Sequence, residues 1–375
     1  MINPASRTKS IELSLIRKMF EVTNPNAINL GIGEPDFNVP ENIKEAMKRS
    51  IDENDTHYTP NKGYLDLREE ITKKFKKENG ITTTPEDVIV TVGASEGLYM
   101  CTQAFVDKGD EVLLPNPSFL SYEACVNLAG GTPVSVDCKM ENEFKLKAED
   151  VQEKITNKTK AIILNSPSNP TGAVMDKEDI KAIADLSIDK NFLIISDEIY
   201  EKIIYGKKNY SPAKYSDNVI TLNGFSKTYA MTGLRIGYLA TTNEDYTEQL
   251  LKIHQYNIAC ANTTAQRGAY EALTGPQDEV KKMVCEFQKR RDLIVSRLND
   301  MGYETVNAEG AFYVFPKIED ENFVQDAAKA GVITVPGVAF GSNGENHVRM
   351  SYANSYENIE KAMDILEGMI NNGWF

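Results

Sequence analysis

The sequence predicts an α/β protein with a mainly parallel, seven-stranded sheet flanked by helices, and with a second, smaller α+β domain. Seven short apolar runs, separated mostly by helical periodicity or turn signals, predict the strands: Val88–Thr91, Glu111–Leu114, Thr132–Val136, Ala161–Leu164, Phe192–Ser196, Val219–Leu222 and Ile236–Ala240. Such alternation is typical of parallel sheets covered by helices on both faces. The length of 375 residues also exceeds what one core usually serves, so we expect two folded units.

The helices of the two units have separate signatures. In Tyr64–Asn79, apolar residues recur every four positions among Lys and Glu, and Gly80 follows as a helix-ending residue. Beyond about Glu271 the pattern changes to a long charged helix, two strand-like pieces and a closing helix: Asp278–Leu298, Ala311–Phe315, Val348–Tyr352 and Ser355–Met369. We therefore expect a large domain over residues 45–275, and a small domain made of 1–44 and 276–375.

Charge and composition exclude several functions. Acidic side chains outnumber basic ones by 55 to 41, for a formal net charge of -14, which is the wrong sign for a nucleic acid backbone or an anionic membrane surface. No apolar signal core begins the chain and no stretch approaches the roughly 20 uncharged residues of a membrane-spanning helix. Five cysteines without a C-x-x-C pair and three widely spaced histidines predict neither a metal site nor a hydrolase triad. A cytoplasmic protein without nucleic acid or membrane partners is expected.

The segment Asn223–Gly237 joins a lysine, a neighbouring hydroxyl and an arginine directly after the predicted strand that ends at Leu222. An amine that forms an imine must be neutral, and a partly desolvated pocket beside other positive charge lowers its pKa. Lys227 is therefore a candidate for imine formation, and Ser226 and Arg235 can serve a phosphate. A surface Ser-Lys turn fits the same residues, and the spacing alone does not decide between the two.

A second group of polar residues follows the predicted buried strand Phe192–Ser196. Asp197 lies at its carboxyl end, where open α/β sheets bind ligands. Its carboxylate can keep a pyridine nitrogen protonated, and Tyr200 can donate a hydrogen bond to a phenolate oxygen of the same ring. Seen alone, Asp197 also suits the N-cap of a helix.

Two loops and one strand add further candidates. Asn169 lies among dense turn residues after another buried strand, placed to bond a ring substituent. The small residues Gly93, Ala94 and Ser95 come between a strand and a helix, where their amides can converge on an anion. Arg349 lies in an alternating, strand-like stretch, and its guanidinium suits a substrate carboxylate. Each signal also fits a purely structural role.

Together these segments resemble the class I/II aminotransferases of PLP fold type I, in the right order and over nearly the whole chain. Leu30–Phe37 (LGIGEPDF) is similar to the family's N-terminal substrate loop, and Tyr58–Tyr64 to the element that follows it. The resemblance implies that the cofactor is pyridoxal 5'-phosphate (PLP). It also implies transfer of an amino group from an L-amino acid to a 2-oxo acid, such as 2-oxoglutarate, by a ping-pong mechanism.

The resemblance assigns a role to each position that matches a family motif. It implies that Lys227 forms the Schiff base with the cofactor and acts as the general base, and that Arg235 binds the phosphate. Asp197 pairs with the pyridine nitrogen, while Tyr200 and Asn169 meet the ring hydroxyl. The remaining matches are Phe119 stacked on the cofactor ring, Gly93, Ala94 and Ser95 cradling the phosphate, and Ile32, Gly33, Asn169 and Arg349 binding the substrate, with Arg349 at its α-carboxylate.

The resemblance further implies a homodimer with a shared active site, in which Tyr58 reaches the cofactor phosphate of the neighbouring subunit. One position departs from the family: Gly224 stands where many members have a phosphate-binding serine, and Ser226 is the candidate replacement. The N-G-F-S-K and M-T-G-L-R motifs are similar to the prokaryotic aspartate, aromatic and N-acetyl-diaminopimelate branch. Ile253–Asn257 together with Tyr58–Gly63 favours the last of these.

Other functions compete with this interpretation. A PLP-dependent carbon–sulfur β-lyase can use the same fold, and fold analogy does not exclude it. A non-catalytic PLP-sensing module of a transcription regulator requires a DNA-binding extension, which the sequence does not show. A nicotinamide-binding protein is disfavoured because no G-x-G-x-x-G opens a helix after a strand. A dicarboxylic donor calls for a second cation, for which Arg7, Lys9, Lys62 and Lys252 are candidates.

Overall fold

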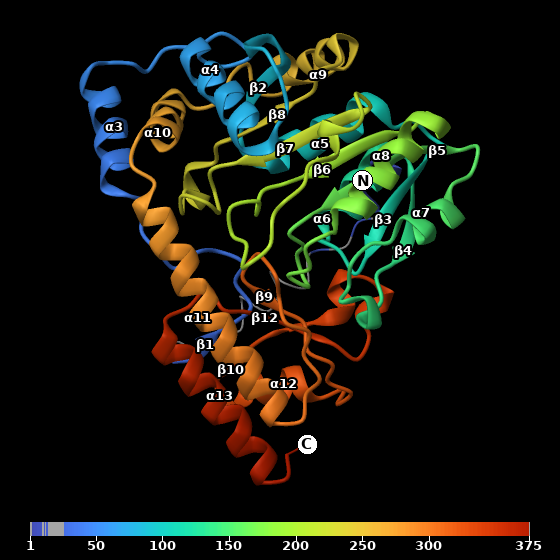
Figure 1. Cartoon of the computed structure of the whole chain (residues 1–375), viewed down its shortest axis with the longest axis vertical. Helices are drawn as coiled ribbons and strands as arrows, with labels where there is room; N and C mark the ends of the chain where they lie inside the picture. The colour runs from blue at the N-terminus through green and yellow to red at the C-terminus, as the bar shows by residue number, and fades with distance from the viewer. Residues whose placement is uncertain (1, 10, 12, 14–25, 375) are drawn as a thin grey trace.

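The structure is a computed structural model that describes residues 2–9, 11, 13 and 26–374. The seven predicted strands are present, with small shifts at their ends: β2 Val88–Thr91, β3 Glu111–Asn116, β4 Thr132–Asp137, β5 Thr159–Asn165, β6 Leu193–Asp197, β7 Val219–Gly224 and β8 Gly237–Ala240. They form one sheet in the order β2-β8-β7-β6-β5-β3-β4, in the upper part of Figure 1. Only β8 runs antiparallel to its neighbours β2 and β7, so the predicted mainly parallel sheet is confirmed.

Burial on both faces explains why these strands are continuous apolar runs. Along β5, Ala161 and Ile163 pack into one apolar cluster, while Ile162 and Leu164 pack into another. All four side chains are buried, because successive residues of a strand point to opposite faces and helices cover both.

The helices of the sheet region are α3 Glu41–Asp52, α4 Leu65–Lys74, α5 Gly93–Phe105, α6 Ser121–Ala129, α7 Ala148–Lys154, α8 Lys177–Lys190, α9 Glu244–Asn257 and α10 Thr263–Thr274; the short α1 spans Ser6–Lys9. The helix predicted for 64–79 is α4, continued by one π-helical turn over Phe75–Asn79. It ends at Gly80 with a φ of 68°, a left-handed conformation that suits glycine.

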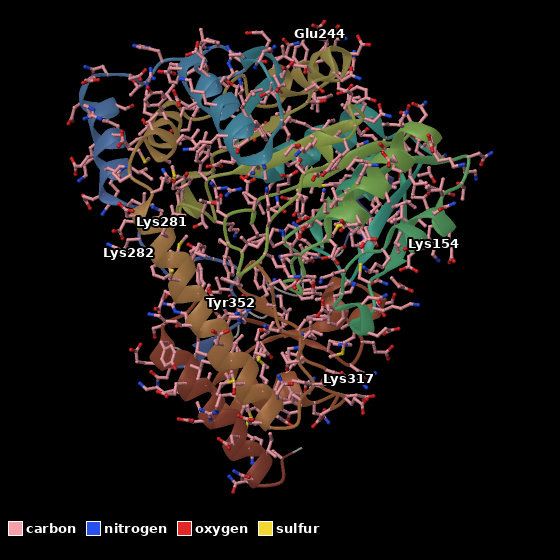
Figure 2. All side chains as sticks on the ribbon, in the orientation of Figure 1. Lys154, Glu244, Lys281, Lys282, Lys317 and Tyr352 are labelled. Atoms are coloured by element: carbon pink, nitrogen blue, oxygen red, sulfur yellow. The ribbon has the colours of Figure 1, made fainter. Side chains whose placement is uncertain are left out.

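The second region lies in the lower part of Figure 1 and is built around a long helix, α11 Asp278–Asp300. The other elements are α12 Phe323–Ala330, α13 Tyr356–Asn371, the parallel pair β1 Ile28–Asn29 and β10 Val332–Ile333, and the antiparallel strands β9 Tyr313–Val314, β12 Val348–Ser351 and β11 Val335–Pro336. Figure 1 shows α11 beside α13, and Arg297 of α11 joins Asp364 of α13 at 2.7 Å. Tyr352, labelled inside the molecule in Figure 2, is fully buried in the core of this region.

The chain passes between the two regions more than once. The predicted domain boundaries, 45–275 against 1–44 with 276–375, stay a prediction, and the one at residue 45 falls inside α3. Within the described residues, every helix is too short or too polar to cross a membrane. The carboxyl ends of β5, β6 and β7 face the second region, so polar side chains from both regions can meet there.

Candidate active site

A pocket of about 330 Å³ lies at the carboxyl ends of the parallel strands, between the sheet and the second region. It brings together most of the residues predicted from the sequence: Ile32, Gly33, Ala94, Ser95, Phe119, Asn169, Asp197, Tyr200, Ser226, Lys227, Arg235 and Arg349. Two predicted residues do not line it. Gly93 lies just outside, against Arg235, and the Tyr58 side chain is 88% exposed.

Lys227 follows β7 and points its amine into the pocket. Its Nζ donates a hydrogen bond of 2.6 Å to the carbonyl oxygen of Gly33. Burial lowers the pKa of Lys227 to about 8, because a charged ammonium loses hydration there. A substantial fraction of this amine is therefore neutral near neutral pH, as a nucleophilic or basic amine requires.

Asp197, the last residue of β6, also lines the pocket and is buried. Burial raises its pKa to about 6, although the Tyr122 hydroxyl opposes this by donating a hydrogen bond of 2.9 Å to Oδ2. Asn165 Nδ2 bonds the Asp197 carbonyl oxygen at 3.0 Å, which joins the ends of β5 and β6. The arrangement provides a buried carboxylate that a cationic ligand group would stabilise.

The start of α5 and the side chain of Arg235 face each other at one end of the pocket. Gly93 opens the helix with a φ of +73°, and a Cβ there would lie 2.8 Å from Nη2 of Arg235. Ala94 and Ser95 follow in the first turn and line the pocket with Ser226. A helix N-terminus, an arginine and two hydroxyl groups form a site suited to an anion such as a phosphate.

Glycine at position 224 has a packing explanation. A Cβ on Gly224 would lie 3.0 Å from Cα of Gly237 on the adjacent strand β8. The close approach of β7 and β8 therefore leaves little room for a serine at this position, whereas Ser226 lies in the pocket.

Arg349 lies on β12 and is 2% exposed. Nη1 donates to Oδ1 of Asn169 at 2.9 Å, and Nη2 donates to the Gly31 carbonyl oxygen at 2.5 Å. The guanidinium also lies 4.6 Å from the Tyr313 ring and 4.8 Å from the Phe340 ring, while its buried Nε has no hydrogen-bond partner in the described structure. The two acceptors are neutral, so a carboxylate ligand would supply the missing counter-charge.

Comparison with known proteins decides the family. The sequence model of the protein family called aminotransferase class I and II matches residues 25–366 of this chain. The chain belongs to this family. A probable aspartate aminotransferase of Methanocaldococcus jannaschii is 50% identical over 97% of this chain and 98% of its own length. Aromatic-amino-acid aminotransferase 2 of Thermococcus litoralis is 44% identical over 98% of each chain.

A solved structure shows the same fold. Aspartate aminotransferase from Thermus thermophilus with maleate aligns with a TM-score of 0.95 at 36% identity, covering 98% of this chain and 100% of that one. The predicted fold type and activity are thereby confirmed, and the protein is a PLP-dependent aminotransferase.

The pocket of this aminotransferase fits the cofactor. It supplies an amine, a buried carboxylate for a protonated ring nitrogen, an aromatic side chain and an anion site, on Lys227, Asp197, Phe119 and Arg235 respectively. Because Gly93 has no Cβ, the Arg235 guanidinium can pack directly against the start of α5, next to the anion site.

Several pocket residues of the aminotransferase were missed by the sequence reasoning. Tyr122 reaches Asp197 from the first turn of α6, and Asn165 is the last residue of β5. Tyr313 bonds the Tyr200 hydroxyl at 2.9 Å, and Thr232 bonds Glu34 at 2.7 Å near Lys227. Only Asn165 had a usable signal, because it is a polar residue at the carboxyl end of a predicted strand.

Proposed function

We propose that Lys227 is the residue that carries the cofactor and moves the proton in this aminotransferase. The observation that carries the proposal is the placement of a neutralisable amine and a buried carboxylate, Lys227 and Asp197, in one pocket. The pKa of Lys227 is lowered to about 8 and that of Asp197 is raised to about 6, both by burial. Strongly shifted groups converging in one cleft are typical of catalytic sites.

The other residues are proposed to bind and orient. Arg235, Ser95 and Ser226 hold the phosphate with the first amides of α5, Phe119 stacks on the ring, and Tyr200 and Asn169 lie at the ring hydroxyl. Bound PLP supplies an electron sink for the pair of electrons left when a Cα–H bond breaks. Asp197 keeps the ring nitrogen protonated, because the carboxylate and the cation stabilise each other in this buried position.

Arg349 is proposed to bind the α-carboxylate of the amino acid, beside Ile32 and Gly33. Fixing that group directs the Cα–H bond toward the Lys227 amine, and orientation of this kind supplies much of the rate enhancement in enzymes. Nζ of Lys227 would be free to accept the Cα proton once the substrate amine has replaced it on the cofactor, and a general base does best with a pKa near the working pH. A 2-oxo acid such as 2-oxoglutarate takes up the amino group in the second half-reaction.

The proposed assembly is a cytoplasmic homodimer. Tyr58 is 88% exposed in the single chain and lies outside its own pocket, so it is available to a neighbouring subunit's phosphate site. Aspartate and aromatic amino acids are proposed donors, because relatives that match almost the whole chain carry those names. N-acetyl-diaminopimelate stays the donor favoured by the sequence motifs.

A donor panel tests the proposed function. Purified protein with excess PLP is incubated with aspartate, phenylalanine, tyrosine or N-acetyl-diaminopimelate and 2-oxoglutarate, and glutamate formation is measured. Pyruvate and ammonia release from cystathionine is followed in parallel. Glutamate is expected without cystathionine cleavage, and Lys227→Ala should abolish both turnover and the visible absorbance of the imine between lysine and cofactor. Normal turnover by Lys227→Ala would refute the assignment.

A further inference from the structure

Asn116, the last residue of β3, connects the carboxyl end of this strand with the loop that precedes the Arg349 strand. Its side chain is buried at 3% exposure, and it does not line the pocket. Nδ2 donates to Oδ1 of Asp137 at 2.9 Å and to Oγ of Ser342 at 3.0 Å, while Oδ1 accepts from the Asn343 amide at 3.1 Å. One amide group therefore joins β3, β4 and the loop at 341–343.

The loop is shaped to receive this side chain. Gly341 has a φ of +125°, and a Cβ on it would collide with Oδ1 of Asn116. Asn343 Nδ2 also donates to the backbone carbonyl oxygens of Asn116 and Cys138, at 3.2 and 2.8 Å. The amide of Ser118 donates to the carbonyl oxygen of Phe340 at 2.8 Å. Phe340, Ser342 and Asn343 thus each bond residues at or just after the carboxyl ends of β3 and β4.

Phe340 precedes the loop, accepts the hydrogen bond from Ser118 and also contacts Arg349. Its ring is 3% exposed and lies 4.8 Å from the guanidinium carbon, with the Tyr313 ring at 4.6 Å. A buried cation over two rings depends on the placement of both rings, because the attraction requires the cation to lie over the ring face. Residues that fix Phe340 therefore also fix the direction of the Arg349 guanidinium.

We propose that Asn116 is a positioning residue for the substrate carboxylate, acting through Phe340 on Arg349. The inference rests on the proposed role of Arg349. The backbone of Asn116 is held independently by the sheet, where its carbonyl oxygen accepts from the Cys138 amide at 2.8 Å. Replacement of the side chain therefore removes the bonds to Ser342 Oγ and the Asn343 backbone amide and loosens the 341–343 loop, while the bonds of the Asn343 side chain and the position of β3 remain.

The test compares Asn116→Ala with Asn218→Ala in the PLP-loaded enzyme. Asn218 Nδ2 bonds the Ser187 carbonyl oxygen at 3.1 Å, far from the pocket lining, so its loss controls for a missing hydrogen bond. Asn116→Ala is expected to raise KM for the best donor and for 2-oxoglutarate roughly three- to tenfold and to lower kcat by a smaller factor, because Arg349 both binds and orients the carboxylate. Asn218→Ala should leave KM unchanged.

Two further variants separate positioning from general destabilisation. Asn116→Asp places a carboxylate against Asp137 and should raise KM, whereas adding Asp137→Asn restores the bond with donor and acceptor exchanged and should rescue KM. Phe340→Leu keeps the core apolar and removes the ring, so it should raise KM even if Asn116→Ala folds poorly. Failure of the rescue, or an unchanged KM in both Phe340→Leu and Asn116→Ala, would overturn the inference.

Arg349→Lys distinguishes this inference from the proposed function. It should raise KM, and Asn116→Ala should have less than its usual effect when combined with it, because both changes act on one contact. An unchanged KM in Arg349→Lys would refute the carboxylate role itself. A raised KM in Arg349→Lys with fully additive Asn116→Ala would overturn only the positioning role.

Discussion

Arg349 donates a hydrogen bond of 2.9 Å from Nη1 to Oδ1 of Asn169, a residue 180 positions earlier in the chain. Arg349 belongs to β12 of the second region, whereas Asn169 lies in the loop after β5 of the sheet. Donor and acceptor are both buried, so the bond is well shielded from water. The hydrogen bond therefore joins Arg349, which is proposed to bind the substrate carboxylate, to Asn169, which is proposed to bind the cofactor ring.

The reactivity of Lys227 should depend on pH in the cofactor-free protein. Its pKa of about 8 implies that about a tenth of the amine is neutral at pH 7, against less than about a thousandth for an ordinary lysine. Brief reductive methylation followed by peptide mass spectrometry should therefore label Lys227 with a midpoint near pH 8. Labelling of Lys154, an exposed lysine at the periphery in Figure 2, shows that the reagent is active in each reaction. A midpoint for Lys227 at the value of about 10.4 that is ordinary for lysine would contradict the prediction.

Asp197→Asn should stabilise the cofactor-free protein while abolishing turnover. The folded-state pKa of about 6 lies above the ordinary 3.8, so stability is lost as pH rises through this interval and the loss is complete above it. Removing the carboxyl should raise the free energy of unfolding at pH 7.5 by on the order of 3 kcal/mol, and by much less at pH 4. Thermal or urea unfolding at both pH values measures this.

The control for Asp197→Asn is Asp179→Asn, because Asp179 is a buried carboxylate paired with Lys147 at 2.9 Å. Breaking that pair should not stabilise the protein. With PLP added, the wild-type protein should become more stable than Asp197→Asn, since the ring cation of the cofactor stabilises the carboxylate. A stabilising effect of Asp197→Asn that persists in the PLP-loaded protein would argue against pairing with the ring.

Gly93→Ala should weaken cofactor binding. A Cβ at this position would lie 2.8 Å from Nη2 of Arg235 and would push the guanidinium away from the anion site. We expect the dissociation constant of PLP, titrated into the cofactor-free protein by absorbance, to rise about tenfold or more. Gly109→Ala is the matched control: its φ is also positive, at +100°, but nothing lies within 4 Å of the added Cβ. Equal losses in both variants would show that backbone strain alone is responsible.

Mixed dimers should show whether Tyr58 serves the partner's site. One chain carries Tyr58→Phe and the other Lys227→Ala, so a shared site leaves one complete pocket in each mixed dimer. The comparison is a heterodimer of one wild-type chain and one chain that carries both substitutions, which has no complete pocket, because the wild-type Lys227 then faces the substituted residue. Each heterodimer is isolated through different affinity tags on its two chains, so that homodimers do not contribute. Retention of PLP and activity at limiting PLP should be higher in the first heterodimer. Equal values would refute the shared site.

Much of the sheet region followed from the sequence. The runs at Val88–Thr91 and Val219–Leu222 are apolar because both faces of the sheet are covered, and that pattern is visible without a structure. The helix end at Gly80 was also predictable, since only local backbone geometry decides it. Tyr122 and Tyr313 were not predictable, because each acts through a partner that is distant in sequence, Asp197 and Tyr200 respectively.

The sequence by itself determined which residue types stand at the carboxyl ends of the strands, Asp197 and Lys227 among them, because strand ends are local features of hydrophobic patterning. Only the tertiary structure decided that Arg349 lies against Asn169 and over two rings, and that Asn116 bonds the loop at 341–343. The physical reason is that the direction of a side chain, its burial and hence its pKa depend on neighbours that folding brings from distant parts of the chain.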